Sequence, residues 1–316
     1  MSDAARVLSQ LAYLDLFKSQ IKTAIDVKGW VANQNYLVVT GMTEKCFTLT
    51  TLDSRRLRAA LANDCNRMSM AAVESICGVE VDLLFPKSSA WAAIRSYYAS
   101  FFAAHALLRI YGCAYSQLEP EHIRKILEMA NALGINSNIR SGLYSIQIDK
   151  TFTTLKFEKQ NDSHKDMWRG FLALINQLLL KIDETSSIGI HKINAMDLLE
   201  EARKCVTKNG SRVVGNWLSE LRNQVNYQHL YGAWFPYDVR AIDERVVKIA
   251  NTKWTYPSHS FNTTEKQGEL ERFFESTAFL LSLLREMICI CSENVDDEGS
   301  VFHNGVLRML RTIKVM

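Results

Sequence analysis

The segment 88–111 constrains the fold of this chain more than any other stretch. It reads SSAWAAIRSYYASFFAAHALLRIY, with alanines alternating with Trp, Tyr and Phe. On a helix, rings of this size would pack into the gaps left by alanine on nearly every side, as in a buried element. Pro86 and Ser88 or Ser89 supply a start, and Gly112 supplies a stop. We therefore expect a long, central helix here.

The scarcity of helix-breaking residues extends this expectation to the rest of the chain. Only 4 Pro and 14 Gly occur among 316 residues, which favours long, mostly helical elements. Hydrophobic content of 47% and charged content of 22% are typical of a folded globular protein, in one large domain or two. The formal net charge of +3 is too small to indicate nucleic-acid binding, so any such binding depends on local patches.

Helical periodicity recurs along the chain, and two regions depart from it. Segments 36–40 with 46–50 and 143–148 with 152–157 have the pattern of β-hairpins. The two hairpins could pair in one small sheet, an arrangement that the sequence does not settle. There is no internal repeat. Further helices are expected at 3–26, from Asp53 to near Gly78, and at about 120–134, 163–182, 195–207, 211–230, 238–250 and 264–291.

The segment 217–236, WLSELRNQVNYQHLYGAWFP, carries the chemistry of interest. Its apolar residues recur at spacings of three and four, which puts them on one helical face. Arg222 and His229 are seven residues apart, so a helix places them on the same side, just off that face. Gly232 and Pro236 end the helical pattern. A cation and an imidazole at the edge of a buried seam suit chemistry on a phosphate.

These residues resemble the R-x4–6-H signature of the HEPN superfamily, a group of helical proteins many of which are metal-independent ribonucleases. Asn223 directly after Arg222 is a frequent choice in that family. Tyr231, two residues beyond His229, resembles the H-x-Y ending of HEPN toxins. The segment 88–111 also resembles the first long helix of HEPN domains. The resemblance covers roughly 86–292 and is specific only at 222–231.

The resemblance implies a mainly α fold, a HEPN-like antiparallel helical bundle with an N-terminal α+β extension and small β-hairpins. The expected division is an extension at 1–85, the HEPN-like domain at 86–292 and a basic amphipathic tail at 293–316. The extension of about 85 residues departs from compact HEPN toxins. The chain therefore resembles the broad superfamily, in which antiviral defence components are common, more than any one system.

The implied function is a metal-independent endoribonuclease of a bacterial defence or toxin system, cleaving single-stranded RNA by 2′-hydroxyl attack. His229 would exchange a proton with the attacking or leaving oxygen. Arg222 would hold the phosphate through bidentate hydrogen bonds, with Asn223 orienting it. Tyr231 would lie beside the groove, where a partner nucleotidyltransferase could adenylylate it. The alternative is a catalytically silent HEPN module acting as a binding or scaffold subunit.

The expected partners follow from the same resemblance. A symmetric homodimer would include 211–231 in its interface and form a composite groove. An antitoxin or another defence-system protein is a further expected partner. RNA backbone would contact a basic patch of Arg203, Lys204, Lys208 and Arg212, although basic loops are also common in proteins that never bind RNA. Alternatively, both residues have purely structural roles: Arg222 caps carbonyls at a helix end, and His229 is an interface histidine whose hydrogen bonds are made within the protein.

Other chemistries lack their motifs. There is no GxGxxG, GxxxxGK[ST], HExxH or GxSxG, so no cofactor or metal is expected. His164 and Asp166 are close together but have no further ligand at metal spacing, and His105 is expected to be a hydrogen-bonded core residue. The 7 Cys are unpatterned, which favours a reducing cytoplasm. Neither a signal peptide nor a membrane span is expected.

Overall fold

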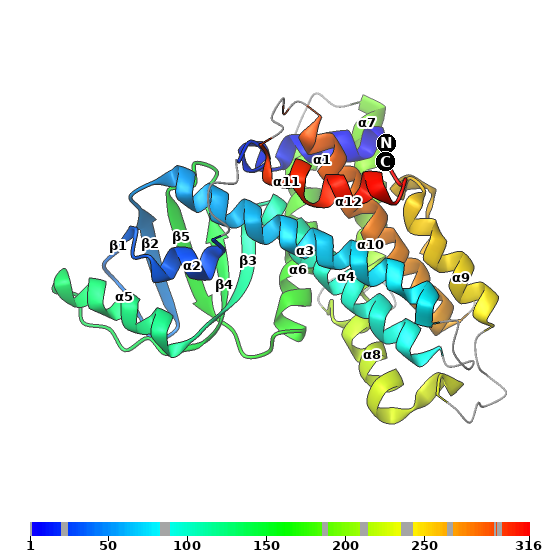
Figure 1. The fold of residues 1–316 in the computed structure, drawn as a ribbon, viewed down its shortest axis with the longest axis horizontal. Coiled ribbons are helices and arrows are strands. Elements are labelled where there is room, and N and C mark those ends of the chain that lie inside the picture. The colour runs from blue at the N-terminus through cyan, green and yellow to red at the C-terminus, as the bar shows by residue number, and fades with distance from the viewer. Residues whose placement is uncertain are drawn as a thin grey trace.

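The computed structural model describes residues 2–19, 25–82, 89–184, 189–208, 214–234, 243–263, 268–293, 295 and 299–316. The protein is mainly helical and carries one antiparallel sheet at one end (Figure 1). This agrees with the expected mainly α fold with small β-hairpins. Two long helices, α3 (Ser54–Asp82) and α4 (Ala90–Ile110), run side by side from the sheet into the helical body.

The sheet has five strands in the order β1-β2-β5-β4-β3. Both expected hairpins form, and β2 pairs with β5 to join them, from Cys46 opposite Glu158 to Thr50 opposite Thr154. A fifth strand that the sequence analysis missed, β3, follows α4 directly and pairs with β4. The strands are β1 (Tyr36–Val38), β2 (Cys46–Thr51), β3 (Cys113–Leu118), β4 (Gly142–Ile148) and β5 (Thr154–Lys159).

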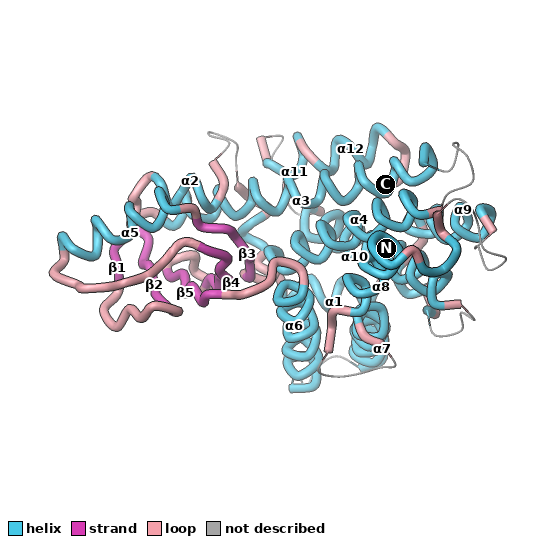
Figure 2. Tube along the Cα trace, turned by 90° about the horizontal axis from the view of Figure 1, so that it is seen from below, coloured by secondary structure: helices cyan, strands magenta, loops and turns pink. Residues whose placement is uncertain are grey.

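One face of the sheet is buried beneath α2 (Val27–Ala32) and α5 (Pro120–Ala132), which Figure 2 shows on the same side. Phe47 stacks on Phe157 on this face, with ring centroids 4.5 Å apart. Side chains alternate between the two faces of a strand, so the neighbouring positions lie on the opposite face. That face carries the cross-strand row Thr48, Lys156 and Gln147, which is partly or fully exposed.

The helical body surrounds α10 (Glu269–Ser292), whose residues are buried on nearly every side, including Phe273, Phe279 and Leu284. It packs against α4, which is also largely buried, as the alternation of alanine and aromatic residues predicted. The helices around this pair are α1 (Asp3–Leu11), α6 (Lys165–Glu184), α7 (Gly189–Val206), α8 (Trp217–Gln228), α9 (Glu244–Thr252), α11 (Val301–Asn304) and α12 (Val306–Thr312).

The sheet draws strands from both sides of the expected boundary at residue 85. Strands β1 and β2 precede it, whereas β3, β4 and β5 follow it. The segment 1–85 therefore does not form a sheet of its own. The C-terminal segment likewise packs on α3 through α11 and α12, where Leu307 and Leu310 are buried.

The helix expected at 3–26 is wrong from Ala12 to Ser19, and residues 20–24 lie outside the described ranges. Helix α1 ends at Leu11, and the backbone N–H of Tyr13 donates to the carbonyl of Ile110 at 2.8 Å. The Tyr13 hydroxyl donates to the carbonyl of Ile148, also at 2.8 Å. These bonds to α4 and β4 end the α-helix, and a short 3-10 helix, η1 (Leu14–Leu16), follows. Helix α2 then begins after Asp26, whose side chain caps the N–H of Gly29.

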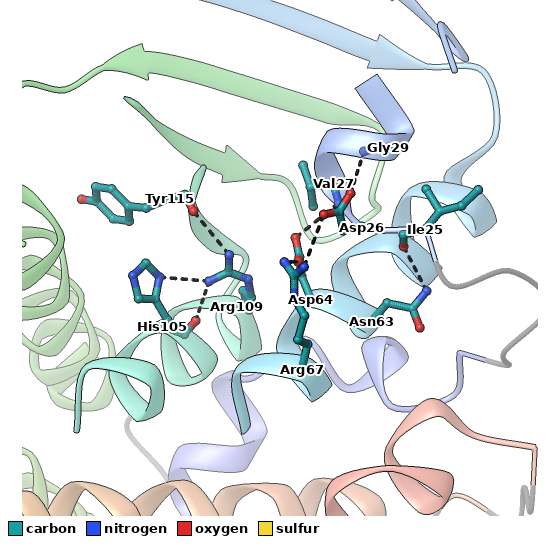
Figure 3. A network of polar contacts seen from close by, with 10 residues as sticks. All are labelled: Ile25, Asp26, Val27, Gly29, Asn63, Asp64, Arg67, His105, Arg109 and Tyr115. Carbon is teal, nitrogen blue, oxygen red and sulfur yellow. Dashed lines mark hydrogen bonds and ion pairs between the residues drawn. The ribbon is translucent and has the colours of Figure 1, made fainter. Parts of the chain in front are cut away.

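A buried polar network connects the sheet to the helices (Figure 3). Arg109 near the end of α4 is 1% exposed and donates to the carbonyls of His105 and Tyr115. Asp64 of α3 accepts from Arg67 at 2.5 Å and from the backbone N–H of Val27 at 3.3 Å. The Arg109 contacts link α4 to β3, and the Asp64 contacts link α3 to α2, which covers the sheet, so together they hold the sheet against the body. Nη1 of Arg109 also lies 3.2 Å from Nδ1 of His105, so His105 is the hydrogen-bonded core residue expected.

Candidate functional site

Helix α8 carries the motif and packs against the first half of α4. Leu218, Leu221 and Val225 are buried on its inner face. The backbone N–H of Ala90, at the start of α4, donates to the carbonyl of Ala233 just beyond α8. The two helices therefore run antiparallel, with the end of α8 at the beginning of α4. The helix begins at Trp217 rather than near 211, and residues 211–213 lie outside the described ranges.

Arg222 is buried at 7% exposure and points at two aromatic rings of α4. Its guanidinium carbon lies 4.9 Å from the centre of the Tyr97 ring and 6.0 Å from that of Tyr98. Its Nε has no hydrogen-bond partner, and no carboxylate in the described part of the chain lies within ion-pair distance. Cation–π contacts offset only part of the cost of burying a charge. Arg222 is therefore a buried cation whose counter-ion is not supplied by the described residues.

The hydroxyl of Tyr97 joins Arg222 to a histidine. It lies 2.7 Å from Nδ1 of His164, and the indole N–H of Trp168 donates to it at 3.2 Å. His164 directly precedes α6, is half-buried and packs its ring 4.7 Å from that of Phe101. Burial raises the pKa of Tyr97. Burial, followed by the charge of Arg222, lowers the pKa of His164, so its imidazole favours the neutral form.

His229 does not share the helical face of Arg222. Helix α8 ends at Gln228, and His229 is its C-cap in the left-handed conformation, with φ of 54°. The helical placement of His229 was therefore wrong, because the chain turns at this residue. The side chain is exposed, and its ring lies 5.9 Å from that of Trp234. No hydrogen bond or ring contact joins His229 to Arg222 within the described ranges.

Asn223 and Tyr231 differ in how they are held. Asn223 is exposed and accessible to a ligand. Tyr231 is half-buried, and its hydroxyl lies 2.7 Å from Oε1 of Gln224 and 2.8 Å from Oε2 of Glu269. Burial and the Glu269 carboxylate raise the pKa of Tyr231. The hydroxyl is therefore protonated and engaged with acceptors at the end of α8.

The basic patch of the sequence analysis is paired with carboxylates wherever it is described. Arg203 pairs with Glu200, Lys204 with Glu201 at 3.5 Å, and Lys208 with Glu269 at 3.1 Å. Lys204 also lines a hollow of about 630 Å³ whose wall includes Asp197, Glu200 and Glu201. Arg212 lies outside the described residues. RNA contact at this patch stays a prediction, and phosphates would have to displace these carboxylates.

Sequence reasoning missed Tyr97, Tyr98 and His164 as site residues. Tyr97 and Tyr98 were treated as core packing, and His164 was weighed only as a metal ligand. Their proximity to Arg222 arises from the packing of α4, α6 and α8. No spacing rule along one chain connects positions 97, 164 and 222. The one available signal was the pair of adjacent tyrosines in a mostly apolar helix, since two neighbouring residues cannot both face the same side.

Two features are absent from the described ranges. No group of three or more His, Cys, Asp or Glu residues there could hold a metal ion. No described helix is long and apolar enough to cross a membrane. Comparison of the chain with protein-family models, curated proteins and solved structures gave no match.

Proposed function

We propose that this chain is a metal-independent endoribonuclease with a HEPN-like fold that acts in a bacterial defence or toxin system. The observation that carries the proposal is the burial of Arg222 without a carboxylate partner among the described residues. An RNA phosphate is a suitable counter-ion because a guanidinium binds phosphate oxygens bidentately. The HEPN-like motif at Arg222, Asn223 and His229 supplies the remaining chemistry.

The proposed reaction is attack by a ribose 2′-hydroxyl on the adjacent phosphate. The O2′–P bond forms, the P–O5′ bond breaks, and the products carry a 2′,3′-cyclic phosphate and a 5′-hydroxyl. Arg222 stabilises the negative charge that develops on the phosphorane. His229, exposed at the end of α8, exchanges a proton with the attacking or leaving oxygen. Asn223 is exposed and next in the chain to Arg222, where it can orient the phosphate.

Exposed aromatic rings beside the motif support a single-stranded substrate. Trp91 is 58% exposed and lies edge-on to Trp234, with centroids 5.5 Å apart. Trp234 in turn contacts His229, and Tyr98 is 36% exposed beside Arg222. Unpaired bases stack on such rings without sequence preference. Trp91 and Tyr98 are seven residues apart on α4, so they lie on the same side of that helix, and Trp234 adds a ring just beyond α8. Several nucleotides could stack on these rings.

A composite site between two copies of the chain would bring together Arg222 and His229, which are apart within one copy. Arg222 and His229 have different ring partners in one chain, so a twofold axis near α8 could bring the His229 of one protomer to the Arg222 of another. We expect a homodimer at micromolar concentration by light scattering. A monomer that cleaves RNA would rule out the composite site and leave the reaction itself standing.

The test is cleavage of single-stranded RNA in the presence of EDTA, with product ends identified by mass spectrometry. Wild type should give 2′,3′-cyclic phosphate ends. His229→Ala should lower the rate by roughly 10²–10⁴-fold. Arg222→Met should also abolish cleavage, while Arg6→Met, a change at an exposed ion pair of α1, should not. Cleavage that survives both site changes, or stops with EDTA, would disprove the mechanism.

The second candidate is a catalytically silent module that binds RNA or a defence-system partner. The lack of contact between Arg222 and His229 in one chain favours it. In this case Arg222 holds a phosphate but no proton transfer follows. RNA binding that depends on Arg222, with no cleavage by wild type under any condition, would establish this candidate.

A further inference from the structure

His164 lies beside the hydroxyl of Tyr97 and is oriented by several contacts. Its backbone N–H donates to Asp162 at 2.8 Å, and its ring packs 4.7 Å from Phe101. Nδ1 lies 2.7 Å from the Tyr97 hydroxyl. The ring is only half-buried, so its remaining edge can meet a ligand. A histidine held this firmly presents its second nitrogen in a defined direction.

The hydrogen bonds around Tyr97 favour one tautomer of His164. The indole N–H of Trp168 can only donate, so the Tyr97 oxygen accepts there, at 3.2 Å. Arg222 also hydrogen-bonds to this oxygen and can only donate, so both acceptor positions are filled and the single hydrogen of the Tyr97 hydroxyl goes either to Nδ1 of His164 or to Ser219. The short distance of 2.7 Å to Nδ1 favours His164. Neutral imidazole with an accepting Nδ1 carries its proton on Nε2. Nε2–H has no hydrogen-bond partner in the described part of the chain.

Burial and the charges around His164 favour its neutral form. Burial and the positive charge of Arg222 on α8 lower its pKa, and the charge of Asp162 on its own segment opposes them. The imidazole is therefore a neutral donor at neutral pH. The Arg222 guanidinium carbon lies 4.9 Å from the centre of the Tyr97 ring, and the His164 ring centre lies 5.7 Å from it, so an anion bound beside Tyr97 would be near two donors.

We propose that Arg222 and His164 form one phosphate-binding site, with Tyr97 as the residue that positions both. The inference rests on the proposed function for the identity of the ligand, a phosphodiester of single-stranded RNA. It adds a phosphate-binding residue that the motif on α8 does not contain. It also gives Tyr97 a role beyond packing, because its hydroxyl favours one His164 tautomer and its ring holds the guanidinium.

The first experiment measures binding of a 2′-O-methyl single-stranded oligonucleotide, which cannot be cleaved by 2′-hydroxyl attack. His164→Phe keeps the ring contacts and removes the donor, so Kd should rise roughly tenfold. His164→Gln can place an amide N–H near the position of Nε2 and should restore most of the affinity. His191→Phe, at the other end of the α6–α7 pair, is the matched control and should bind as wild type. Equal affinity of wild type and His164→Phe would overturn the inference.

A second readout does not depend on RNA. Nitrogen-15 NMR of the histidine rings should show His164 as the Nε2–H tautomer, and Tyr97→Phe should mix the tautomers. Titration with inorganic phosphate should shift the Nε2 resonance in wild type and not in Arg222→Met. A tautomer with the proton on Nδ1, or no phosphate-dependent shift, would overturn the inference. A protein that shows the phosphate shift but neither binds nor cleaves RNA would retain the site and refute the proposed function.

Discussion

Nη1 of Arg109 lies 3.2 Å from Nδ1 of His105, with both side chains buried in the network that joins the sheet to the helices (Figure 3). A guanidinium can only donate, so Nδ1 of His105 must accept, and the imidazole is neutral. The same Nη1 donates to the backbone carbonyl of His105 at 2.9 Å. Protonation of His105 would therefore place a second buried cation against Arg109.

The first prediction is that this pair makes the fold sensitive to acid. Burial, and then the charges of Arg109 and His164, set the pKa of His105 well below its usual value of 6.5. The unfolded chain binds the proton more readily, so stability is full above about pH 6.5 and is lost as pH falls below that value. Urea unfolding at pH 7.5 and pH 5 should show this loss. His105→Gln, which can still accept from Arg109, should reduce it, and an unchanged loss would contradict the prediction.

A pair of glycines tests the junction between α4 and β3. Gly112 and Gly134 both have positive φ, of 76° and 71°. A Cβ on Gly112 would lie 2.3 Å from Cε2 of Tyr13, whereas one on Gly134 would meet nothing within 4 Å. Gly134→Ala should thus lower the free energy of unfolding by about 1–2 kcal/mol, the strain of an alanine in the left-handed conformation. Gly112→Ala should cost about 1–3 kcal/mol more, through the clash. Equal losses in chemical denaturation would mean that Tyr13 moves aside freely.

Elements that depend on neighbouring residues could be predicted from the sequence, whereas those that depend on contacts between distant residues could not. Local patterns were sufficient for α4, where alanine and aromatic residues alternate, and for both hairpins. The pairing of β2 with β5 and the strand β3 depend on contacts between distant segments, and β3 is a short run whose pattern is weak alone. At the site, Arg222 was found from its motif. His164 was missed because only tertiary packing brings it to Tyr97.

Tyr231 gives a third prediction. Its hydroxyl hydrogen-bonds to Gln224 and Glu269. The hydrogen bond to Glu269 is the largest cause of the lowered pKa of that carboxyl group, and Lys208 lowers it further. Tyr231→Phe should cost about 1 kcal/mol of stability, the usual net value of one hydrogen bond. It should also raise the pKa of Glu269, measurable by carbon-13 NMR. Lys208→Gln is the control that leaves the hydroxyl in place. A pKa that rises only in Lys208→Gln would show that the hydroxyl contributes nothing.

The last prediction compares two buried arginines. Arg109 donates to two carbonyls and an imidazole, so Arg109→Met should leave these acceptors unsatisfied and cost roughly 3–5 kcal/mol. Arg222 has cation–π contacts but no carboxylate partner in the described ranges, so Arg222→Met removes an uncompensated charge and keeps the packing against Tyr97. We expect its Tm to be unchanged or higher by roughly 1–3 °C.

The same Arg222→Met variant should lose RNA binding, because it lacks the guanidinium that would hold the phosphate. A site kept for an external anion also lowers the stability of the free protein. Differential scanning calorimetry with and without the 2′-O-methyl oligonucleotide measures both effects. RNA should raise the Tm of wild type and Arg109→Lys, and leave that of Arg222→Met unchanged. If Arg222→Met instead loses as much stability as Arg109→Met, then the guanidinium of Arg222 is a structural element whose partners lie within the chain, and its charge is not reserved for a ligand.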